Sequence, residues 1–493
     1  MMTLSPALRK TAYVATALTL LLTLAWVRIH DMSMRTDLHA DEVYSLMLAQ
    51  CNPSYSTLPP DGCYSGAELK EMLAVRHPAG EDIARLWLNN GDTPHASLYY
   101  MALRLALGDY DHWDPSGLAW RGGILNMLFF ILSYLLLWAI VRRLYGESIL
   151  LTLATLATAF GNTMAINNTL LVREYQMAET FLLWFTLIAV ELMIAIRRGE
   201  PILPRRWVTG AVAVALAMST GYLNAYYIIM VSAGVAITAW RYSRRREIAI
   251  LTGALAGGVI LAWALYAGFF NFALHKSVHT SRAFGSLRGA VTLTFVRDIA
   301  YGLFTMAGVR LAAIVLIAAL IFKGGRLRLV KSPDMPWLPI AAMAAMLAVQ
   351  YTSVLKMPRY GYPLVPVVTL IVPHLLSCVP RELRIVFSIA ALVYYPYRAV
   401  SRPTVPRYGW EQTSRLLKEP AMIYGLNPNE LVLVSPCLND STIYRISSAR
   451  VLNADTVTRM VSRQVQFPAG LRVKSVPVAG RHIKLYIIES SGM

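Results

Sequence analysis

Two adjacent carboxylates follow the first long apolar segment of the chain, within the string His39-Ala40-Asp41-Glu42-Val43-Tyr44. Acidic side chains beside a membrane-spanning segment are costly unless they face water or take part in chemistry. A carboxylate at a membrane surface can act as a general base when it stays ionised and reaches an acceptor hydroxyl. The simpler interpretation is a solvated pair that caps the following helix, because acidic residues are favoured near helix N-termini. Taken alone, the pair favours the cap.

A second polar string in the same region joins a histidine to aromatic residues. His95 follows Asp92-Thr93-Pro94, and Tyr99 and Tyr100 come shortly after it. A histidine in front of an aromatic amphipathic helix can bind a sugar or a phosphate. Tyrosines also belong to the interfacial belt of membrane proteins, so this string leaves both interpretations open.

A third string offers ligands for a metal ion. Asp109, Asp111 and His112 lie within a few residues of one another, and such groups can coordinate a divalent cation. A turn that leads into the next helix explains them more simply, because Asp114-Pro115 is typical of a helix start. We therefore expect no required cofactor, with a divalent metal on these three residues as the weaker alternative.

Several cations lie between later apolar segments. Arginine can grip a phosphate through two parallel hydrogen bonds, whereas the plainer role of such cations is to reach out to lipid headgroups. Two short motifs and a basic loop at 271–300 together favour phosphate binding. The residues predicted to hold a phosphate or lipid are Arg173, Lys276, Arg282, Lys356, Arg359 and Tyr360, with Glu174 beside them.

The composition places these strings in a polytopic membrane protein. Hydrophobic residues make up 56% of the chain and charged residues 15%, whereas soluble domains carry about 25% charged residues. The chain has a net charge of +18, and its lysines and arginines cluster at alternate ends of apolar segments. This distribution is not typical of a nucleic-acid-binding protein. Eleven spans are predicted, near 11–29, 118–141, 148–168, 177–196, 207–220, 225–240, 248–270, 301–322, 337–355, 361–379 and 385–397.

The basic clusters set the predicted orientation. Placing all of them in the cytoplasm satisfies the positive-inside bias, with a cytoplasmic N-terminus and an external C-terminus. The first apolar segment is expected to be a retained helix, because no small-x-small cleavage site follows it cleanly. The weakest pair of spans is 207–220 and 225–240, since each is short for a bilayer.

Two modules are predicted from this topology. Residues 1–397 form the transmembrane module, with an outer loop at 30–117 that contains helices near 41–50 and 97–107. Residues 398–493 form a small external α/β domain, with strands at 431–435 and 483–488 and a helix at 453–463. Cys51 and Cys63 share the outer loop and could pair in an oxidising compartment, a question that the sequence leaves open.

These strings, in this order, resemble the GT-C superfamily of glycosyltransferases, of the kind related to protein O-mannosyltransferases and the lipid A aminoarabinose transferase. The resemblance covers roughly residues 10–380. The matching pieces are Asp41-Glu42-Val43-Tyr44, Thr93-Pro94-His95 with Leu98-Tyr99-Tyr100, Arg173-Glu174-Tyr175, and Arg359-Tyr360 with Pro363 and Pro366.

The resemblance implies a polyprenyl-phosphate-linked sugar donor and a lipid, glycan or protein acceptor. It makes Asp41 the catalytic base, with Glu42 orienting the acceptor or Asp41, and it gives the basic outer residues to the donor phosphate. His95, Tyr99, Tyr100 and Glu174 become candidates for acceptor or sugar binding. It also implies inversion of the anomeric centre and a periplasmic or lumenal active site, most simply in a bacterial inner membrane.

Two other functions remain possible from the sequence. An O-antigen ligase or polymerase would use the same kind of donor but would depend on outer arginine and histidine rather than on Asp41. A lipid-linked sugar transporter or flippase would also explain many spans and outer cations. Transporters often show internal repeats and polar residues at mid-membrane, neither of which the sequence shows.

Overall fold

In the computed structural model the chain folds into two compact units. One unit comprises Met1–Asp31, Trp87–Tyr99 and Ile124–Thr404, and the other Met32–Leu86, Tyr100–Gly123 and Val405–Met493. We call them the helical unit and the sheet unit. The structure describes residues 6–35, 37–52, 57–72, 77–88, 97–108, 114–146, 148–270, 309–322, 335, 337–353, 358–377, 379–401, 409–448, 458–463, 465, 467, 472–478 and 483–489.

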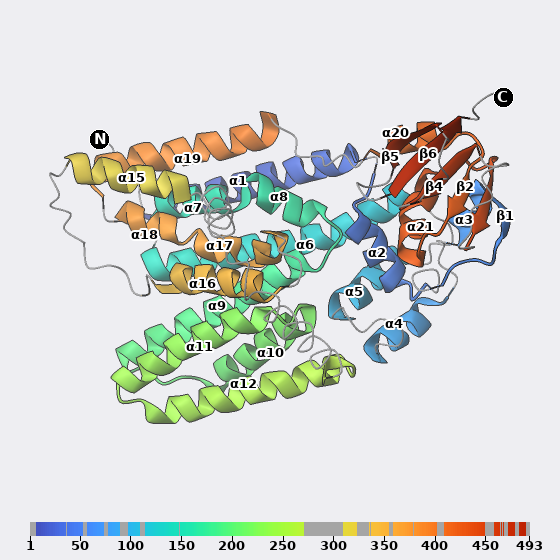
Figure 1. The fold of residues 1–493 in the computed structure, drawn as a ribbon. Coiled ribbons are helices and arrows are strands. Elements are labelled where there is room, and N and C mark those ends of the chain that lie inside the picture. The colour runs from blue at the N-terminus through green and yellow to red at the C-terminus, as the bar shows by residue number, and fades with distance from the viewer. Residues whose placement is uncertain are drawn as a thin grey trace. The chain divides into compact units, whose positions relative to one another are not determined.

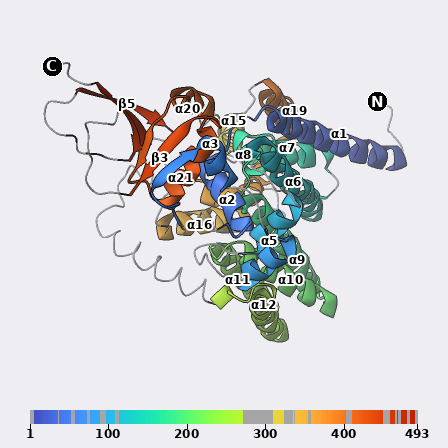
Figure 2. The ribbon, with the colours of Figure 1, turned by 90° about the vertical axis from the view of Figure 1, so that its right-hand side faces the viewer.

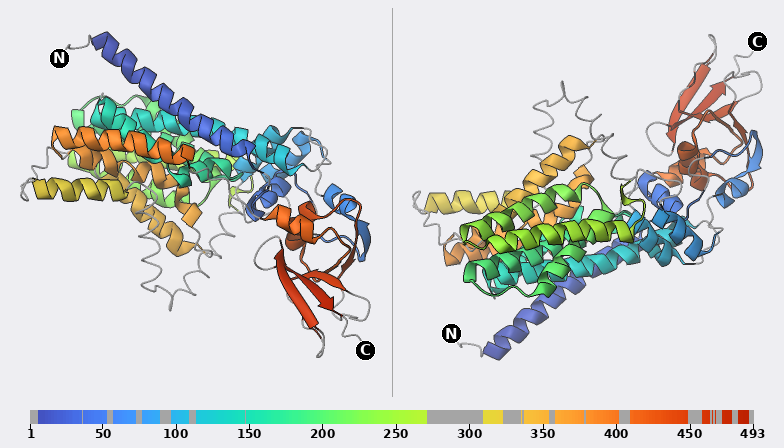
Figure 3. Two further views of the ribbon diagram at one scale, coloured as in Figure 1. Left: turned by 90° about the horizontal axis from the view of Figure 1, so that it is seen from above. Right: turned by 90° about the horizontal axis from the view of Figure 1, so that it is seen from below.

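The helical unit is built from long apolar helices that lie lengthwise beside one another (Figure 1). Its first helices are α1 (Pro6–Ser33), α6 (Pro115–Tyr145), α7 (Ile149–Phe160), α8 (Thr163–Leu170) and α9 (Tyr175–Arg198). The later ones are α10 (Pro204–Thr220), α11 (Asn224–Arg241), α12 (Arg245–Leu265), α15 (Val309–Phe322), α16 (Trp337–Thr352), η3 (Pro358–Leu364), α17 (Val365–Val368), α18 (Ile371–Ser377) and α19 (Arg381–Ser401). Helices α10 and α11 pack on α9, and α12 packs on both of them, as the green and yellow-green ribbons in Figure 3 show.

Six helices of the described chain are long and apolar enough to cross a membrane, or seven if α7 and α8 form one bent span. The six are Lys10–Ser33, Ser116–Tyr145, Tyr175–Arg198, Arg245–Leu265, Arg359–Ser377 and Arg381–Ser401. The chain is therefore an integral membrane protein. Each of the eleven predicted ranges overlaps a helix, but the count of eleven spans is not confirmed. Helices such as α16 are apolar but shorter than a full span.

Basic residues from different helix ends meet within the helical unit. Glu191 in α9 lies 2.9 Å from Arg143 at the end of α6 and 3.8 Å from Arg206 at the start of α10. Arg244, just before α12, donates to the carbonyl of Glu200 at 3.4 Å. These contacts join neighbouring helix ends, and the predicted placement of the basic clusters on one side of a membrane stays a prediction.

The sheet unit contains a six-stranded sheet in the order β1-β3-β2-β4-β6-β5. Its strands are β1 (Gly62–Ser65), β2 (Met422–Tyr424), β3 (Ile443–Ser447), β4 (Arg459–Ser462), β5 (Arg472–Val478) and β6 (Ile483–Glu489). Strand β2 pairs in parallel with both β3 and β4, and the other pairings are antiparallel. Helices α3 (Gly66–Glu71), α20 (Trp410–Leu416) and α21 (Pro428–Val434) accompany it (Figure 2).

Alternation along the strands gives this sheet two apolar faces, because successive side chains point to opposite sides. Ile423, Val461 and Leu485 belong to the larger cluster, which includes Leu69 of α3 and Leu431 of α21. Their neighbours in the strands, Met460 and Tyr486 among them, form a second cluster with Phe467 and Val473. The shorter helices of the unit thus cover one face, and side chains that follow β4 contribute to the other.

The sheet unit corrects two predictions from the sequence. Residues 431–435 fall in α21 and the turn after it, because Asn427 and Glu430 form a reciprocal cap and Pro428 occupies the first turn. The predicted helix at 453–463 is wrong over its described part, where Arg459–Ser462 is strand β4 between β2 and β6. The strand at 483–488 is confirmed as β6, and the helices near 41–50 and 97–107 as α2 (Ala40–Ala49) and α5 (Ser97–Leu107).

The sheet also crosses the predicted module boundary. Strand β1 comes from the predicted outer loop at 30–117, yet it pairs with β3 of the C-terminal segment, Gly62 opposite Ile446 and Ser65 opposite Ile443. The boundary predicted at residue 397 falls inside α19, which continues to Ser401. The α/β fold predicted for residues 398–493 is therefore completed by residues from the first loop.

Candidate active site

Asp41 lies in the first turn of α2, held there by a capping box. The His39 ring accepts a hydrogen bond from the Asp41 amide at 3.1 Å, and the Glu42 carboxylate accepts one from the His39 amide at 2.8 Å. This reciprocal arrangement satisfies two helix N–H groups that would otherwise lack partners. The start of α2, and with it the position of Asp41, is fixed by local sequence.

The Asp41 carboxylate keeps access to solvent. Its side chain is 21% exposed, and one carboxylate oxygen lies 3.6 Å from Nδ1 of His39, whose side chain is 30% exposed. A general base must be within reach of the acceptor hydroxyl. The partial exposure of Asp41 is compatible with that role, which stays a prediction.

Glu42, unlike Asp41, forms a buried ion pair. Its carboxylate is fully buried and lies 2.6 Å from Nη2 of Arg35, whose side chain is only 2% exposed. The same oxygen accepts the hydrogen bond from the His39 amide. Glu42 therefore holds together the start of α2 and the segment before it, and its predicted role toward an acceptor stays a prediction.

Arg173 lies in the short connection between α8 and α9 in the helical unit. Its guanidinium faces the carboxylate of Glu174, with Nε–Oε2 at 3.1 Å and Nη2–Oε1 at 3.3 Å. The guanidinium carbon also lies 5.9 Å from the centre of the Tyr175 ring, within the range of a cation–π contact. Arg173 is buried, which keeps this arrangement away from bulk water.

The helix η3 brings a second arginine to the same place. The Tyr360 ring lies 6.3 Å from the Tyr175 ring, and the Arg359 guanidinium lies 6.0 Å from the Tyr360 ring. Helix η3 packs against α9, so residues far apart in the sequence meet at the first turn of α9. We call Arg173, Glu174, Tyr175, Arg359 and Tyr360 the arginine–tyrosine cluster.

The charge of the arginine–tyrosine cluster favours an anion. It contains two guanidinium groups and one carboxylate, and it adjoins the N-terminus of a helix of 24 residues. That end of a helix carries partial positive charge. Arginine is well suited to phosphate because its planar fork matches two oxygens at once. This composition suits an anion, and the phosphate-binding role predicted for Arg173, Arg359 and Tyr360 stays a prediction.

Tyr99 and Tyr100 are both buried in the described structure. Their exposed fractions are 0% and 2%, and the Tyr99 hydroxyl donates to Oδ1 of Asn126 at 3.3 Å. Asn126 in turn donates to the carbonyls of Thr169 and Leu171 at the end of α8. Tyr99 thus supports the backbone just before Arg173, and its predicted part in acceptor or sugar binding stays a prediction.

A buried polar network joins four helices of the helical unit. Arg28 of α1 donates to Thr169 at 2.9 Å and to the Phe160 carbonyl at 2.8 Å, and its guanidinium stacks on Phe130 at 3.9 Å. Thr169 donates to Gln176, which donates to Glu179 at 2.7 Å. Glu179 also accepts from Asn168 at 3.0 Å. Charged residues inside apolar segments are a signal for such a network, and the sequence predictions did not use them.

The sheet unit holds a second buried ion pair that the sequence did not reveal. Arg104 donates to Asp82 at 2.7 Å and to the backbone carbonyls of Gly108 and His77 at 2.6 and 2.9 Å. Burial raises the pKa of Asp82 above its ordinary value, while the hydrogen bond from Arg104 works in the opposite direction. This pair fixes α4 (Ala79–Leu88) against α5.

Several predicted residues lie outside the described chain. They are the acceptor candidate His95, the phosphate candidates Lys276, Arg282 and Lys356, the metal candidates Asp109, Asp111 and His112, and the whole basic loop 271–300. The part of the chain that the structure describes contains no group of three or more His, Cys, Asp or Glu side chains able to hold a metal ion. Cys51 and Cys63 are free thiols, so the disulfide left open by the sequence is not formed.

Comparisons with known proteins give similarity in structure only. No family model matches the chain. No curated protein matches it in sequence either. The crystal structure of ArnT from Cupriavidus metallidurans bound to undecaprenyl phosphate is similar over 98% of both chains, with a TM-score of 0.47 and 12% identity. Its apo form covers 90% of this chain and 97% of its own, at a TM-score of 0.43 and 11% identity.

An oligosaccharyltransferase from Archaeoglobus fulgidus, crystallised with a tethered acceptor peptide, is also similar. It covers 86% of this chain and 63% of its own, with a TM-score of 0.41 and 11% identity.

Proposed function

We propose that this integral membrane protein is a glycosyltransferase that moves a sugar from a polyprenyl-phosphate donor to an acceptor hydroxyl. The observation that carries the proposal is the arginine–tyrosine cluster, in which Arg173 and Arg359 meet at one aromatic pair. A cationic cluster at the end of a membrane-spanning helix suits a ligand that joins a phosphate to a lipid chain. The partly exposed Asp41 supplies a carboxylate base.

The proposed reaction is a single displacement at the anomeric carbon. The acceptor oxygen forms the new bond to that carbon, the bond to the phosphate oxygen breaks, and the acceptor proton goes to Asp41. The departing phosphate gains negative charge, which Arg173 and Arg359 stabilise electrostatically. One displacement inverts the anomeric centre. The phosphate is already a good leaving group, so the mechanism requires no metal.

The proposal also places the reaction on one side of the membrane. With the basic helix ends in the cytoplasm, the positive-inside bias puts the arginine–tyrosine cluster on the periplasmic or lumenal side. A bacterial inner membrane is the proposed setting. The acceptor would be a lipid, a glycan or a protein hydroxyl.

The test is transfer by the purified protein in lipid nanodiscs, with radiolabelled polyprenyl-phosphate sugars offered one at a time. We expect one donor to be consumed, and Asp41→Asn to lower turnover by about 10²-fold or more, the usual contribution of a general base. Asp440→Asn is the matched control, because this acid of the sheet unit is exposed and bonds only to Lys70 at 2.8 Å among its described ion pairs.

Two results would overturn the proposal. If no donor is consumed by the wild-type protein, the class of enzyme is wrong. If a donor is consumed and Asp41→Asn keeps full turnover, Asp41 is not the base, and a ligase-like mechanism that depends on arginine and histidine takes its place.

A further inference from the structure

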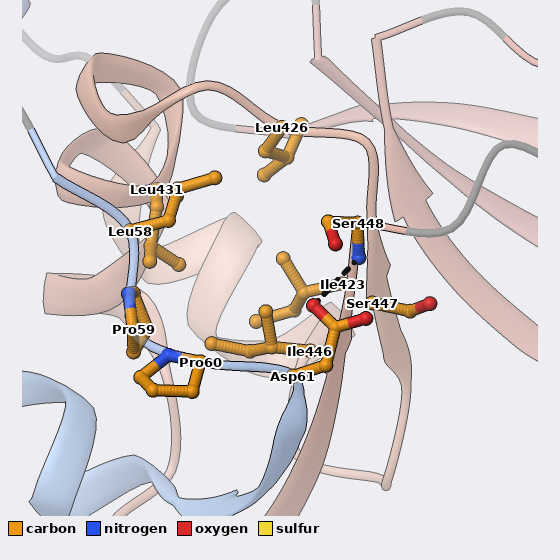
Figure 4. A pocket seen from close by; sticks show the side chains of 10 residues that line it. All are labelled: Leu58, Pro59, Pro60, Asp61, Ile423, Leu426, Leu431, Ile446, Ser447 and Ser448. Carbon is orange, nitrogen blue, oxygen red and sulfur yellow. Dashed lines mark hydrogen bonds between the residues drawn. The ribbon is translucent and has the colours of Figure 1, made fainter.

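The sheet unit contains a cavity of about 380 Å³ that the proposed chemistry does not use (Figure 4). Its apolar lining includes Ile423, Leu426, Leu431 and Ile446, and Asp61 and Ser448 add polar groups to its rim. We call it the sheet-end cavity. Ligand sites in proteins are concave and mostly apolar, with a few polar groups that fix the orientation of the ligand, and this cavity has that character.

The fold explains why the cavity lies where it does. Strands β2 and β3 are parallel neighbours, and half of the lining residues lie in or just after their carboxyl ends, namely Ile423, Leu426, Ile446, Ser447 and Ser448. In open α/β sheets, ligands bind outside the carboxyl ends of parallel strands. Strand β2 has β3 on one side and β4 on the other. The chain therefore passes from β2 to β3 on one side, and then from β3 back across β2 to β4 on the other side. This is the kind of position at which a crevice opens.

The antiparallel register of β1 with β3 places the Asp61 carboxylate at the cavity. Gly62 lies opposite Ile446, so the residue before β1 reaches the end of β3. Asp61 Oδ1 accepts a hydrogen bond from the Ser448 amide at 2.9 Å, which fixes the carboxylate at the rim, as the dashed line in Figure 4 shows. The aspartate comes from the first loop and the apolar lining from the C-terminal segment.

The charge of the lining decides which substrate fits. Asp61 is the only charged residue that lines the described cavity, and a carboxylate repels a phosphate. The anionic donor therefore does not suit the cavity. A sugar does, because its hydroxyls donate to a carboxylate and its C–H face packs against aliphatic side chains. We propose that the sheet-end cavity binds a neutral saccharide portion of the acceptor. This inference rests on the proposed function and specifies a glycan-bearing acceptor.

Binding is tested apart from transfer, on the full-length protein in detergent micelles. Saturation-transfer NMR with maltose, lactose, cellobiose and mannobiose, each at millimolar concentration, asks which sugar contacts the protein. We expect a signal for at least one of them. Asp61→Asn should weaken its binding about 10-fold, as loss of a charge-assisted hydrogen bond does, while still accepting from the Ser448 amide.

Leu431→Trp is the second variant, since the larger side chain fills the cavity and should abolish the signal. Asp440→Asn is the control and should bind as the wild type does. Unfolding temperatures measured for all variants show whether each still folds. If Leu431→Trp does not fold, the binding result for Asp61→Asn alone tests the inference.

Three results overturn the inference: no sugar binds, both cavity variants bind normally, or a serine-containing hexapeptide binds at this cavity and no sugar does. Failure here leaves the proposed transfer reaction intact, because donor consumption is measured separately. Loss of donor consumption with sugar binding retained would instead overturn the proposed function.

Discussion

Asp41 and Glu42 are neighbours in sequence, but the helix gives them different tasks. Successive residues of a helix point about 100° apart, so an adjacent pair near one helix start cannot share an environment. The Asp41 side chain keeps 21% exposure, whereas the Glu42 side chain is fully buried against Arg35. The sequence identified the pair as chemically unusual. It could not say which member faced water, because the direction of α2 depends on tertiary packing.

Glu42 is expected to be essential for stability. Glu42→Gln removes the negative charge that lies 2.6 Å from the buried Arg35 guanidinium, and breaking a buried ion pair on one side costs about 3–5 kcal/mol. We predict a clear loss of thermal stability, measured by the unfolding temperature of the purified protein in detergent. The double variant Arg35→Met with Glu42→Leu removes both charges and should recover part of the loss. A single variant as stable as the wild type would contradict a structural role for the pair.

Cys51 and Cys63 should differ in reactivity. Burial raises the pKa of the Cys51 thiol to about 11, with the Asp82 carboxylate adding to the effect, whereas Cys63 is exposed. Since the thiolate is the reactive form, iodoacetamide at pH 8 should label Cys63 first and Cys51 slowly, with Cys51 labelling faster as pH rises toward 11. Mass spectrometry of the labelled protein without reductant measures both rates. No labelling of either thiol would mean that they form the disulfide.

Among the single residues, two of the predicted phosphate candidates lie beside one pair of tyrosine rings, and their predicted role stays a prediction. Arginines expected on the outer side of the membrane stand out in the sequence, because the positive-inside bias leaves few cations there. Arg173 lies 5.9 Å from the Tyr175 ring and Arg359 lies 6.0 Å from the neighbouring Tyr360 ring. The supporting residues were missed. Asn126 is an ordinary amide within an apolar segment, and only the fold brings it to the end of α8.

At the scale of elements, the break between α7 and α8 positions the arginine–tyrosine cluster. The two helices meet at an angle of 58°. Asn162 accepts from two amides of α8 and donates to two carbonyls of α7, so it caps both helix ends at the break. Added Cβ atoms at Gly161 would approach the Ala157 carbonyl to 2.6 Å and Cβ of Tyr395 to 2.9 Å. Only glycine allows α19 to pack this closely there.

Arg28 is expected to hold this break in place. Arg28→Met removes the hydrogen bonds to Thr169 and to the carbonyl of Phe160, the last residue of α7, in a buried part of the unit. We predict a loss of about 1–3 kcal/mol in stability, the cost of leaving buried hydrogen-bonding groups without this partner, seen as a lower unfolding temperature.

Arg28→Lys serves as the matched control for this prediction. It keeps the charge, but an ammonium group cannot reproduce the planar contacts with Phe130 and two separate acceptors. It should therefore lie between the wild type and Arg28→Met. Equal unfolding temperatures for all three proteins would show that the network does not stabilise the bend.

The helical elements were the easiest part of the fold to predict, because apolar segments in a membrane protein must form helices that satisfy their own backbone groups. The break at Gly161 was not predicted. The segment 148–168 reads as one continuous apolar run, and the angle depends on contacts from α1 and α19. The short elements of the sheet unit were also harder, since a capped helix and a strand can share the same apolar residues, as at Leu431–Val434.

At the scale of the whole chain, the sheet unit joins segments that are separated by the helical unit in sequence. Strand β1 has four residues, Gly62-Cys63-Tyr64-Ser65, and carries no alternating apolar pattern that would identify it as a strand. It becomes one because β3 offers an unpaired edge, and pairing satisfies backbone groups on both strands. Such a partner is invisible in local sequence, which is why the C-terminal segment was predicted to fold alone.

This pairing can be tested by a cross-link between the two segments. Cys63 lies directly opposite Arg445 in the register of β1 and β3. Opposite residues in an antiparallel pair have Cα atoms about 4.5–5.5 Å apart, within the range of a disulfide. In a Cys51→Ser background, Arg445→Cys should therefore form a disulfide with Cys63 under mild oxidation. After cleavage between the segments, the two fragments should stay linked on a non-reducing gel.

Arg472→Cys provides the control, because β5 lies at the opposite edge of the sheet from β1 and its Arg472 is exposed. It should give no link to Cys63 under the same oxidation. If Arg445→Cys also fails to link while both thiols label with iodoacetamide, the two segments do not pair, and the sheet-end cavity would lose the aspartate that β1 delivers to it. A strong link from Arg445→Cys alone shows that one sheet unites the first loop with the C-terminal segment.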